Sequence, residues 1–258
     1  MTRLAGERAL VTGSTAGIGR EIAIRFAAEG ATVAVTGRNR ERGDATIETI
    51  ARAGGHAVFL PYDLDDDSSA DRLVSAAAET LDGLTILVNN AVAGAVDQAD
   101  GPVAELGADA WDATLRVNLT APMRLAAAAI PHMLAAGHGS IINISSRQAE
   151  RAARGFTAYI ASKSGLNGLT RAIAVDYADH NIRCNTISPG YVINERRDAD
   201  LSDERRTRLE GMHLTRLGEA ADVAHAAVYL ASAESEFVTG INLPLDGGSS
   251  AARGTVLG

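Results

Sequence analysis

The stretch Ala9-Leu10-Val11-Thr12-Gly13-Ser14-Thr15-Ala16-Gly17-Ile18-Gly19 decides the fold. A strand-like run, Ala9–Thr12, leads into three glycines spaced G-xxx-G-x-G, and a helical pattern, Gly17–Glu29, follows at once. Glycines let the backbone of such a turn approach a ligand, and the free N–H groups at a helix start bind phosphate. In this context the turn indicates the pyrophosphate site of a dinucleotide-binding α/β domain.

The alternation of strand and helix continues along the chain. The strand-like runs are Ala9–Thr12, Thr32–Thr36, Ala57–Leu60, Ile86–Val88, Ser140–Ile144, Ile182–Ile187 and Ile241–Leu245. The helix candidates are Gly17–Glu29, Arg40–Ala53, Ser68–Leu81, Asp109–Leu134, Ala158–Ala178 and Ala220–Ala231. Such alternation predicts one α/β domain over residues 1–258, a Rossmann-like, doubly wound, parallel sheet of seven strands with helices on both faces.

One segment, Tyr191–Leu214, breaks this rhythm. It lies between the sixth strand and the last helix and is crowded with arginine, aspartate and glutamate. An insertion at the carboxyl end of a strand is well placed to form a lid over a site. A solvated pair of helices explains the same charge, and both interpretations stay open.

Composition excludes several classes of function. The net charge of −8 argues against a nucleic-acid surface. No apolar run is long enough to span a membrane, and the N-terminus lacks the features of a signal peptide, so we expect a cytoplasmic protein. The single Cys184 is expected to be a buried strand residue. The histidines show no paired ligand spacing, so no metal is expected. His213, in the charged segment, is interpreted as a surface residue, with contact to substrate as the alternative.

Five loops should meet at the carboxyl edge of the sheet, where open α/β sheets bind ligands. They carry Thr12–Gly13, Gly37–Arg38, Asn89–Asn90, Ser145–Ser146 and Pro189–Gly190. No acidic residue that could bind a ribose 2′-hydroxyl occurs between Gly30 and Glu41. Arg38 therefore predicts NADP(H) over NAD(H), because arginine pairs with a 2′-phosphate. The alternative is that Arg38 is an ordinary surface arginine.

Tyr159 and Lys163 stand four residues apart in a helical stretch, so they share one face. A phenol needs help to exchange a proton at neutral pH, and a nearby ammonium stabilises the phenolate. Lys163 is also the only lysine among 24 basic residues. These two residues therefore indicate acid–base chemistry on an alcohol or carbonyl oxygen.

Taken together, these residues resemble the single-domain short-chain dehydrogenases/reductases, over essentially the whole chain. The resemblance rests on Thr12–Gly19, Asn89-Asn90-Ala91, Asn118, Ser146, Tyr159-x-x-x-Lys163, Pro189-Gly190 and Asp246-Gly247-Gly248. It implies that Tyr159 is the general acid or base and that Lys163 binds the nicotinamide ribose. It further implies that Ser146, thirteen residues before Tyr159, positions the substrate oxygen, and that Asn118 bends its helix and holds a water.

The resemblance also implies a set of cofactor contacts. They are Gly13, Ser14, Thr15, Gly17, Ile18, Gly19, Arg38, Asp63, Leu64, Asn90, Ala91, Tyr159, Lys163, Pro189, Gly190, Val192 and Asn194. Asp63 would contact adenine, Asn90 the adenosine ribose, and the Val192 backbone the nicotinamide amide. Two positions depart from the family pattern: Val92 replaces a glycine, and Asn194 stands where threonine is frequent.

The implied function is NADP(H)-dependent interconversion of a ketone and a secondary alcohol by hydride transfer. An NAD-preferring alcohol dehydrogenase is the main alternative. A non-catalytic nucleotide sensor and a dehalogenase-like lyase agree less well, because such relatives lose the tyrosine, the lysine or the glycine turn. A homotetramer is implied, with helices Asp109–Leu134 and Ala158–Ala178 between subunits. The substrate stays open; Arg147, Arg151 and Arg154 form a hypothetical edge for an anionic one.

Overall fold

A computed structural model of the chain describes residues 2–63, 69–93, 100–194 and 197–251. All strands pair in parallel in one seven-stranded sheet of order β3-β2-β1-β4-β5-β6-β7. The strands are β1 (Arg8–Val11), β2 (Thr32–Gly37), β3 (His56–Pro61), β4 (Ile86–Asn89), β5 (Gly139–Ile144), β6 (Ile182–Pro189) and β7 (Asn242–Leu245). The predicted doubly wound sheet is confirmed, with each strand within two residues of its expected bounds.

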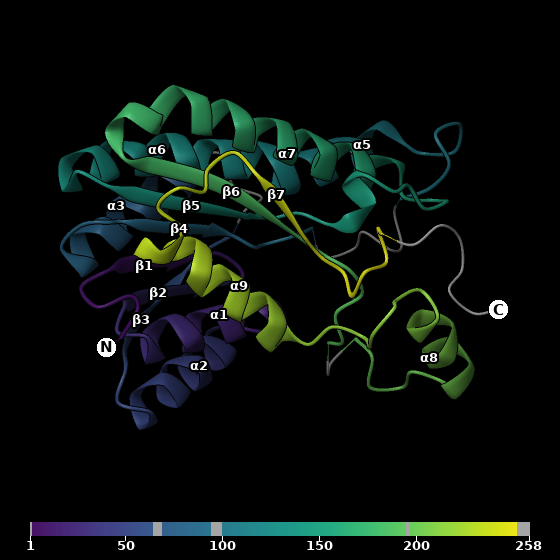
Figure 1. Cartoon of the computed structure of the whole chain (residues 1–258), viewed down its shortest axis with the longest axis horizontal. Coiled ribbons are helices and arrows are strands. Elements are labelled where there is room, and N and C mark those ends of the chain that lie inside the picture. Colours follow the sequence, from purple (N-terminus) through teal and green to yellow (C-terminus); the bar gives the residue numbers. More distant parts are fainter. Residues whose placement is uncertain (1, 64–68, 94–99, 195–196, 252–258) are drawn as a thin grey trace.

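Helices cover both faces of the sheet (Figure 1). One face carries α1 (Gly17–Ala28), α2 (Arg40–Arg52) and α9 (Ala220–Ala231). The other carries α3 (Ser69–Leu81), α6 (Ala121–Ala136) and α7 (Thr157–Tyr177). Each layer buries its own apolar cluster against the strands. Because both faces are covered, β4 and β5 are buried at every position rather than at every second one.

The helices bind the sheet through apolar stripes of helical period. In α3 the buried Leu73, Ala77 and Leu81 recur every four residues and therefore lie on one face. On the opposite layer, Ile22 and Phe26 of α1 belong to the same cluster as Val228 of α9. Burying each such large side chain contributes about 1.5–3 kcal/mol.

The predicted single helix Asp109–Leu134 is wrong in one respect, because it is interrupted. It consists of α5 (Ala108–Leu115), a π-helical turn at Arg116–Thr120, and α6. The cause lies at Pro122, which has no N–H to donate four residues back to Asn118 and whose ring crowds that carbonyl. The π-helical turn contains one residue more than an α-helical turn. Its backbone hydrogen bonds therefore span five residues, as in the bond from the Ala121 N–H to the Arg116 carbonyl.

Cys184 lies in β6 and is fully buried, as expected. Burial raises the pKa of its thiol to about 12, so it stays protonated and inert at neutral pH. Among the helices of the described ranges, none has the length and apolarity needed to cross a membrane.

Parallel pairing brings all the strand carboxyl ends to one edge. From β1 the chain proceeds outward to β2 and β3, then returns to the other side of β1 to form β4. The chain therefore leaves β1 and β4 for helices on opposite faces of the sheet, and the crevice at such a switch point is where these sheets bind ligands. Figure 1 shows α8 (Asp203–Glu210) beside the two helical layers rather than within them.

Candidate active site

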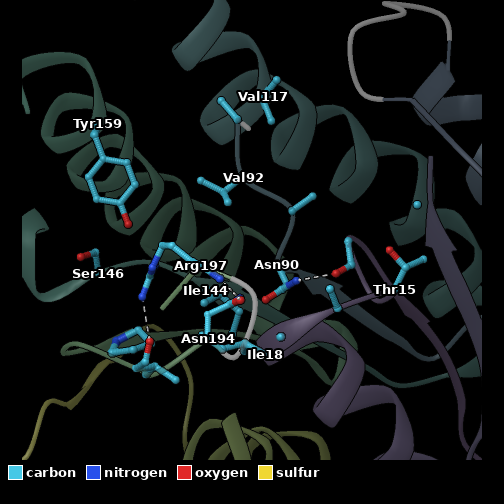
Figure 2. A pocket seen from close by; sticks show the side chains of 18 of the residues that line it. Thr15, Ile18, Asn90, Val92, Val117, Ile144, Ser146, Tyr159, Asn194 and Arg197 are labelled. Atoms are coloured by element: carbon cyan, nitrogen blue, oxygen red, sulfur yellow. Dashed lines mark hydrogen bonds between the residues drawn. The ribbon is translucent and has the colours of Figure 1, made fainter. Parts of the chain in front are cut away.

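A cleft of about 1050 Å³ opens at this carboxyl edge and collects residues from all five predicted loops. The predicted site residues that line it are Gly13, Thr15, Gly17, Ile18, Arg38, Asp63, Asn90, Ala91, Ser146, Tyr159, Lys163, Pro189, Gly190, Val192 and Asn194. Ser14, Gly19 and Asn118 are buried behind its wall. Leu64 lies outside the described residues. Figure 2 shows Ser146 and Tyr159 on one side of the cleft, and Thr15 and Asn90 on the other.

The glycine turn is shaped for close backbone approach. Gly17 has φ +53°, a conformation that disfavours any side chain, and a Cβ on Gly19 would lie only 2.3 Å from Asn90 Nδ2. Ser14 ties the turn to β2, because its hydroxyl donates to the Val11 carbonyl (2.6 Å) and accepts from Thr36 N (2.8 Å). The N-cap residue of α1, Ala16, offers no side-chain acceptor, so the first-turn N–H groups are left for an anion.

Asn90 lines the cleft, but its amide is already engaged by the glycine turn. Asn90 Nδ2 donates to the carbonyls of Thr12 (2.9 Å) and Gly13 (3.3 Å). Thr12 Oγ1 in turn accepts from the backbone N–H groups of Asn90 (3.0 Å) and Ala91 (3.1 Å). The two loops on either side of the crevice are therefore joined, a role for Thr12 and Asn90 that sequence reasoning missed.

Tyr159 and Lys163 come from adjacent turns of α7. Lys163 is 3% exposed, and its Nζ donates to the Ile144 carbonyl (2.8 Å) and lies 5.8 Å from the centre of the Tyr159 ring. Burial lowers the pKa of Lys163 to about 8, so the amine still carries its charge at pH 7. A cation is thereby held beneath the phenol in a place shielded from water.

Ser146 and Ser145 have different hydrogen-bond partners. The Ser145 hydroxyl donates to the Lys163 carbonyl (3.2 Å) and is thereby occupied. Ser146 Oγ instead accepts from Gln148 N (3.1 Å), which leaves its own proton to be donated. A hydroxyl that already accepts from the protein is suited to donate to a substrate oxygen, so the geometry agrees with the choice of Ser146.

Asn118 lies in the π-helical turn and is fully buried. Its Oδ1 accepts from Ala93 N (3.0 Å), and its Nδ2 donates to Ser162 Oγ (3.2 Å). Ser162 Oγ donates onward to the Tyr159 carbonyl (2.7 Å). Asn118 thus connects the loop after β4 to the helix that carries the tyrosine.

Asp100 is a residue near the site that sequence reasoning missed. Its carboxylate accepts from the N–H groups of Ala158 (3.0 Å) and Tyr159 (2.9 Å). The local N-cap residue of α7, Phe156, makes no such bond. A carboxylate distant in sequence therefore caps the helix that holds the tyrosine and the lysine.

A second arginine lines the same cleft as Arg38. Arg38 is exposed, and Arg42 comes from the first turn of α2. The Nε of Arg42 is buried without a hydrogen-bond partner among the described residues. A desolvated donor of this kind lacks an acceptor, and a phosphate oxygen would provide one.

A cluster around Arg197, which sequence reasoning missed, also lines the cleft. Arg197 lines the cleft, donates to the Val192 carbonyl (3.0 Å) and holds Asp198 through Nε and Nη2 (both 3.0 Å). Burial opposes ionisation of Asp198, but hydrogen bonds from Arg197, Asn194 N and Tyr191 outweigh it and lower its pKa to about 2. Figure 2 shows Arg197 between Tyr159 and Asn194.

The two departures from the family pattern are accommodated locally. Among the described residues, only Asp82 and Asn181 combine a side chain with positive φ, so Val92 carries no left-handed strain. Val92 lines the cleft with 49% of its surface exposed. Asn194 packs on the glycine turn, since a Cβ on Gly17 would lie 2.8 Å from Asn194 Nδ2.

Three further expectations concern the arginines after Ser146, His213 and metal binding. Arg147 bonds to Ser249 and to Met212 Sδ (3.4 Å), and Arg151 and Arg154 are exposed; none is among the described residues that line the cleft. His213 is buried, so the surface interpretation is wrong. Over the described ranges, no group of three histidine, cysteine or acidic side chains could hold a metal ion.

Comparison with known proteins identifies close relatives. A family model described as enoyl-(acyl carrier protein) reductase matches residues 13–250. The 2,5-dichloro-2,5-cyclohexadiene-1,4-diol dehydrogenase of Sphingobium indicum is 36% identical over 248 residues, covering 96% of this chain and 98% of that protein. The 7α-hydroxysteroid dehydrogenase of Clostridium sardiniense is 37% identical over 249 residues, covering 96% and 95%.

Solved structures agree. A putative short-chain alcohol dehydrogenase from Sinorhizobium meliloti superposes with a TM-score of 0.91 at 38% identity, covering 98% of this chain and 99% of that one. A putative 2-deoxy-D-gluconate 3-dehydrogenase from Agrobacterium tumefaciens, with bound NADP, gives 0.87 at 33%, covering 97% and 99%. Carveol dehydrogenase from Mycobacterium avium, in complex with NAD, gives 0.89 at 28%, covering 98% and 100%.

Proposed function

Because the chain belongs to the short-chain dehydrogenase/reductase family and is an NAD(P)-dependent oxidoreductase, we propose that it interconverts a small-molecule ketone and a secondary alcohol, with NADP(H) as preferred cofactor. The observation that carries this proposal is the grouping of Tyr159, Lys163 and Ser146 in one cleft with the glycine turn. Tyr159 is proposed as the general acid–base group.

The residues present fit such a cofactor. The glycine turn and the open first turn of α1 would hold the pyrophosphate, and Asp63, Arg38 and Arg42, which line the same cleft, would contact the adenosine part. The unpartnered Nε of Arg42 supports a 2′-phosphate there, and therefore NADP(H) over NAD(H). The relatives themselves bind NADP in one case and NAD in another.

The chain's own groups account for the proton chemistry. When bound, the reduced nicotinamide supplies the hydride. The Ser146 hydroxyl donates a hydrogen bond to the substrate oxygen, and the Tyr159 hydroxyl delivers a proton to that oxygen as it becomes an alkoxide. The buried Lys163 ammonium stabilises the phenolate that Tyr159 leaves behind. In the oxidative direction the same groups work in reverse.

The acid–base assignment is tested by exchange of Tyr159. We expect Tyr159→Phe to reduce turnover about 10²- to 10⁴-fold while NADP⁺ binding, measured by calorimetry, persists. Ser146→Ala should also lose turnover, and Ser145→Ala, whose hydroxyl faces the protein, serves as the matched control. Ring ketones open the substrate screen, because two relatives are named for alcohols on rings. Full turnover by Tyr159→Phe would refute the mechanism.

Cofactor preference is tested separately. Arg38→Asp should weaken NADP⁺ binding strongly and leave NAD⁺ binding unchanged or improved, because the carboxylate repels a 2′-phosphate and accepts from a 2′-hydroxyl. An unchanged preference would overturn the Arg38 assignment but not the enzyme class.

The quaternary structure belongs to the same proposal. Large apolar side chains are exposed on the layer of α5, α6 and α7, among them Trp111, Met123, Leu134 and Val175. We infer that these helices pack against further copies of the chain in a homotetramer.

A further inference from the structure

His213 lies at the end of the charged segment and has both ring nitrogens engaged. It is 5% exposed. Its Nε2 accepts from Tyr191 N (3.1 Å), and its Nδ1 lies 2.9 Å from the Leu209 carbonyl. A carbonyl can only accept, so Nδ1 carries the proton and Nε2 does not. The two partners therefore fix one neutral tautomer of the ring.

These bonds join two parts of the molecule that differ in exposure. Leu209 is the buried residue of α8, whose other side chains are exposed. Tyr191 is the second residue after β6, and its carbonyl accepts from Gly218 N (2.9 Å). The Gly218 carbonyl accepts from Ile193 N (2.9 Å), so Val192 between them is held as a short bridge facing the cleft. His213 thus connects α8 to the cleft wall.

The imidazole ring of His213 is tightly packed by its neighbours. A Cβ on Gly190 would lie 2.7 Å from His213 Nε2 and 2.9 Å from Asp246 Cα. A Cβ on Gly247 would lie 3.3 Å from the Cβ of His213. The next residue, Leu214, is tied to Gly247 through its N–H (2.8 Å). The ring therefore fills a gap between the loops that follow β6 and β7.

Resting on the proposed function, we propose that His213 is a positioning residue. Its neutral ring fastens α8 to the Tyr191–Ile193 wall and thereby sets the shape of the cleft around Val192. Val192 is the residue expected to present its backbone to the cofactor. His213 itself touches neither substrate nor cofactor, so it acts through Tyr191 N.

The test uses two variants and a matched control. His213→Phe keeps a ring but makes neither bond, and His213→Gln keeps one acceptor and one donor. His225→Phe, on the exposed face of α9, is the control. Tryptic cleavage at the exposed arginines of α8 is timed at pH 8, NADP⁺ binding is measured by calorimetry, and KM for NADPH is separated from kcat.

We expect His213→Phe to speed cleavage and raise KM for NADPH, each about tenfold, with a smaller effect on kcat. His213→Gln should restore both values and the binding of NADP⁺. Wild-type cleavage and KM in the Phe variant, or no recovery in the Gln variant, would overturn the proposal. Absence of ketone reduction by the wild type would refute the proposed function alone, because cleavage and binding still decide the role of His213.

Discussion

Lys163 carries a charge in a place almost without water, and its protonation should be visible in stability. Burial holds its folded pKa at about 8, against an ordinary 10.5. At pH values between about 8 and 10.5, Lys163 is protonated in the unfolded chain and deprotonated in the folded chain. The free energy of unfolding should therefore rise with pH across this window, by up to about 3 kcal/mol.

The measurement compares wild type with Lys163→Met, without nucleotide, by chemical denaturation at pH 7.5 and pH 10. Titration of all other groups cancels in the difference between the two proteins. Wild type should gain stability relative to the variant at the higher pH. A difference independent of pH would show that Lys163 titrates normally.

The sequence predicted which residues meet in the cleft, because the glycines and Ser146 follow strands directly and Tyr159 and Lys163 share one face of a helix. Ser146, Tyr159, Lys163 and the glycines all line or support one cleft. Arg197 and Asp100 could not be found in this way. Arg197 reaches the cleft only through the path of the charged segment, and Asp100 acts on a helix 58 residues further along the chain. No local pattern records either contact.

At the scale of elements, α7 owes its start to Asp100. Asp100→Ala would leave the N–H groups of Ala158 and Tyr159 without their acceptor. We expect the free energy of unfolding to fall by about 1–2 kcal/mol. We also expect kcat to fall while KM changes less, because Tyr159 is in the affected turn. Asp112→Ala, an exposed carboxylate of α5, is the control. Equal kinetics in both variants would limit Asp100 to ordinary capping.

Elements of clear period were predicted well, and the exception is instructive. The long helix around Asn118 shows continuous helical periodicity, which hides a single inserted residue. Pro122 was the available signal, since it cannot donate to the carbonyl four residues earlier. The direction of the Asn118 side chain could not be predicted, because it depends on hydrogen bonds with Ala93 and Ser162, which are distant in sequence.

At the scale of the whole molecule, the layer of α5, α6 and α7 exposes several large apolar side chains. Val175 of α7 is 79% exposed. Val175→Arg should lower the molar mass measured by light scattering, because a buried arginine without a partner disfavours the interface. Val103→Arg, at a site 78% exposed and outside the helices, is the matched control. An unchanged mass for Val175→Arg would contradict packing of subunits through α7.

The chain's use of a single lysine has a practical consequence. Apart from the α-amino group, Lys163 offers the only primary amine for acylating reagents, and it lies in the wall of the cleft. Every ε-amide formed on the intact protein therefore reports one position, readable as one mass increment. The rate at which that mass increment accumulates measures how accessible Lys163 is to reagent in the cleft. Nucleotides or other ligands that cover Lys163 can be ranked by how far they slow this acylation.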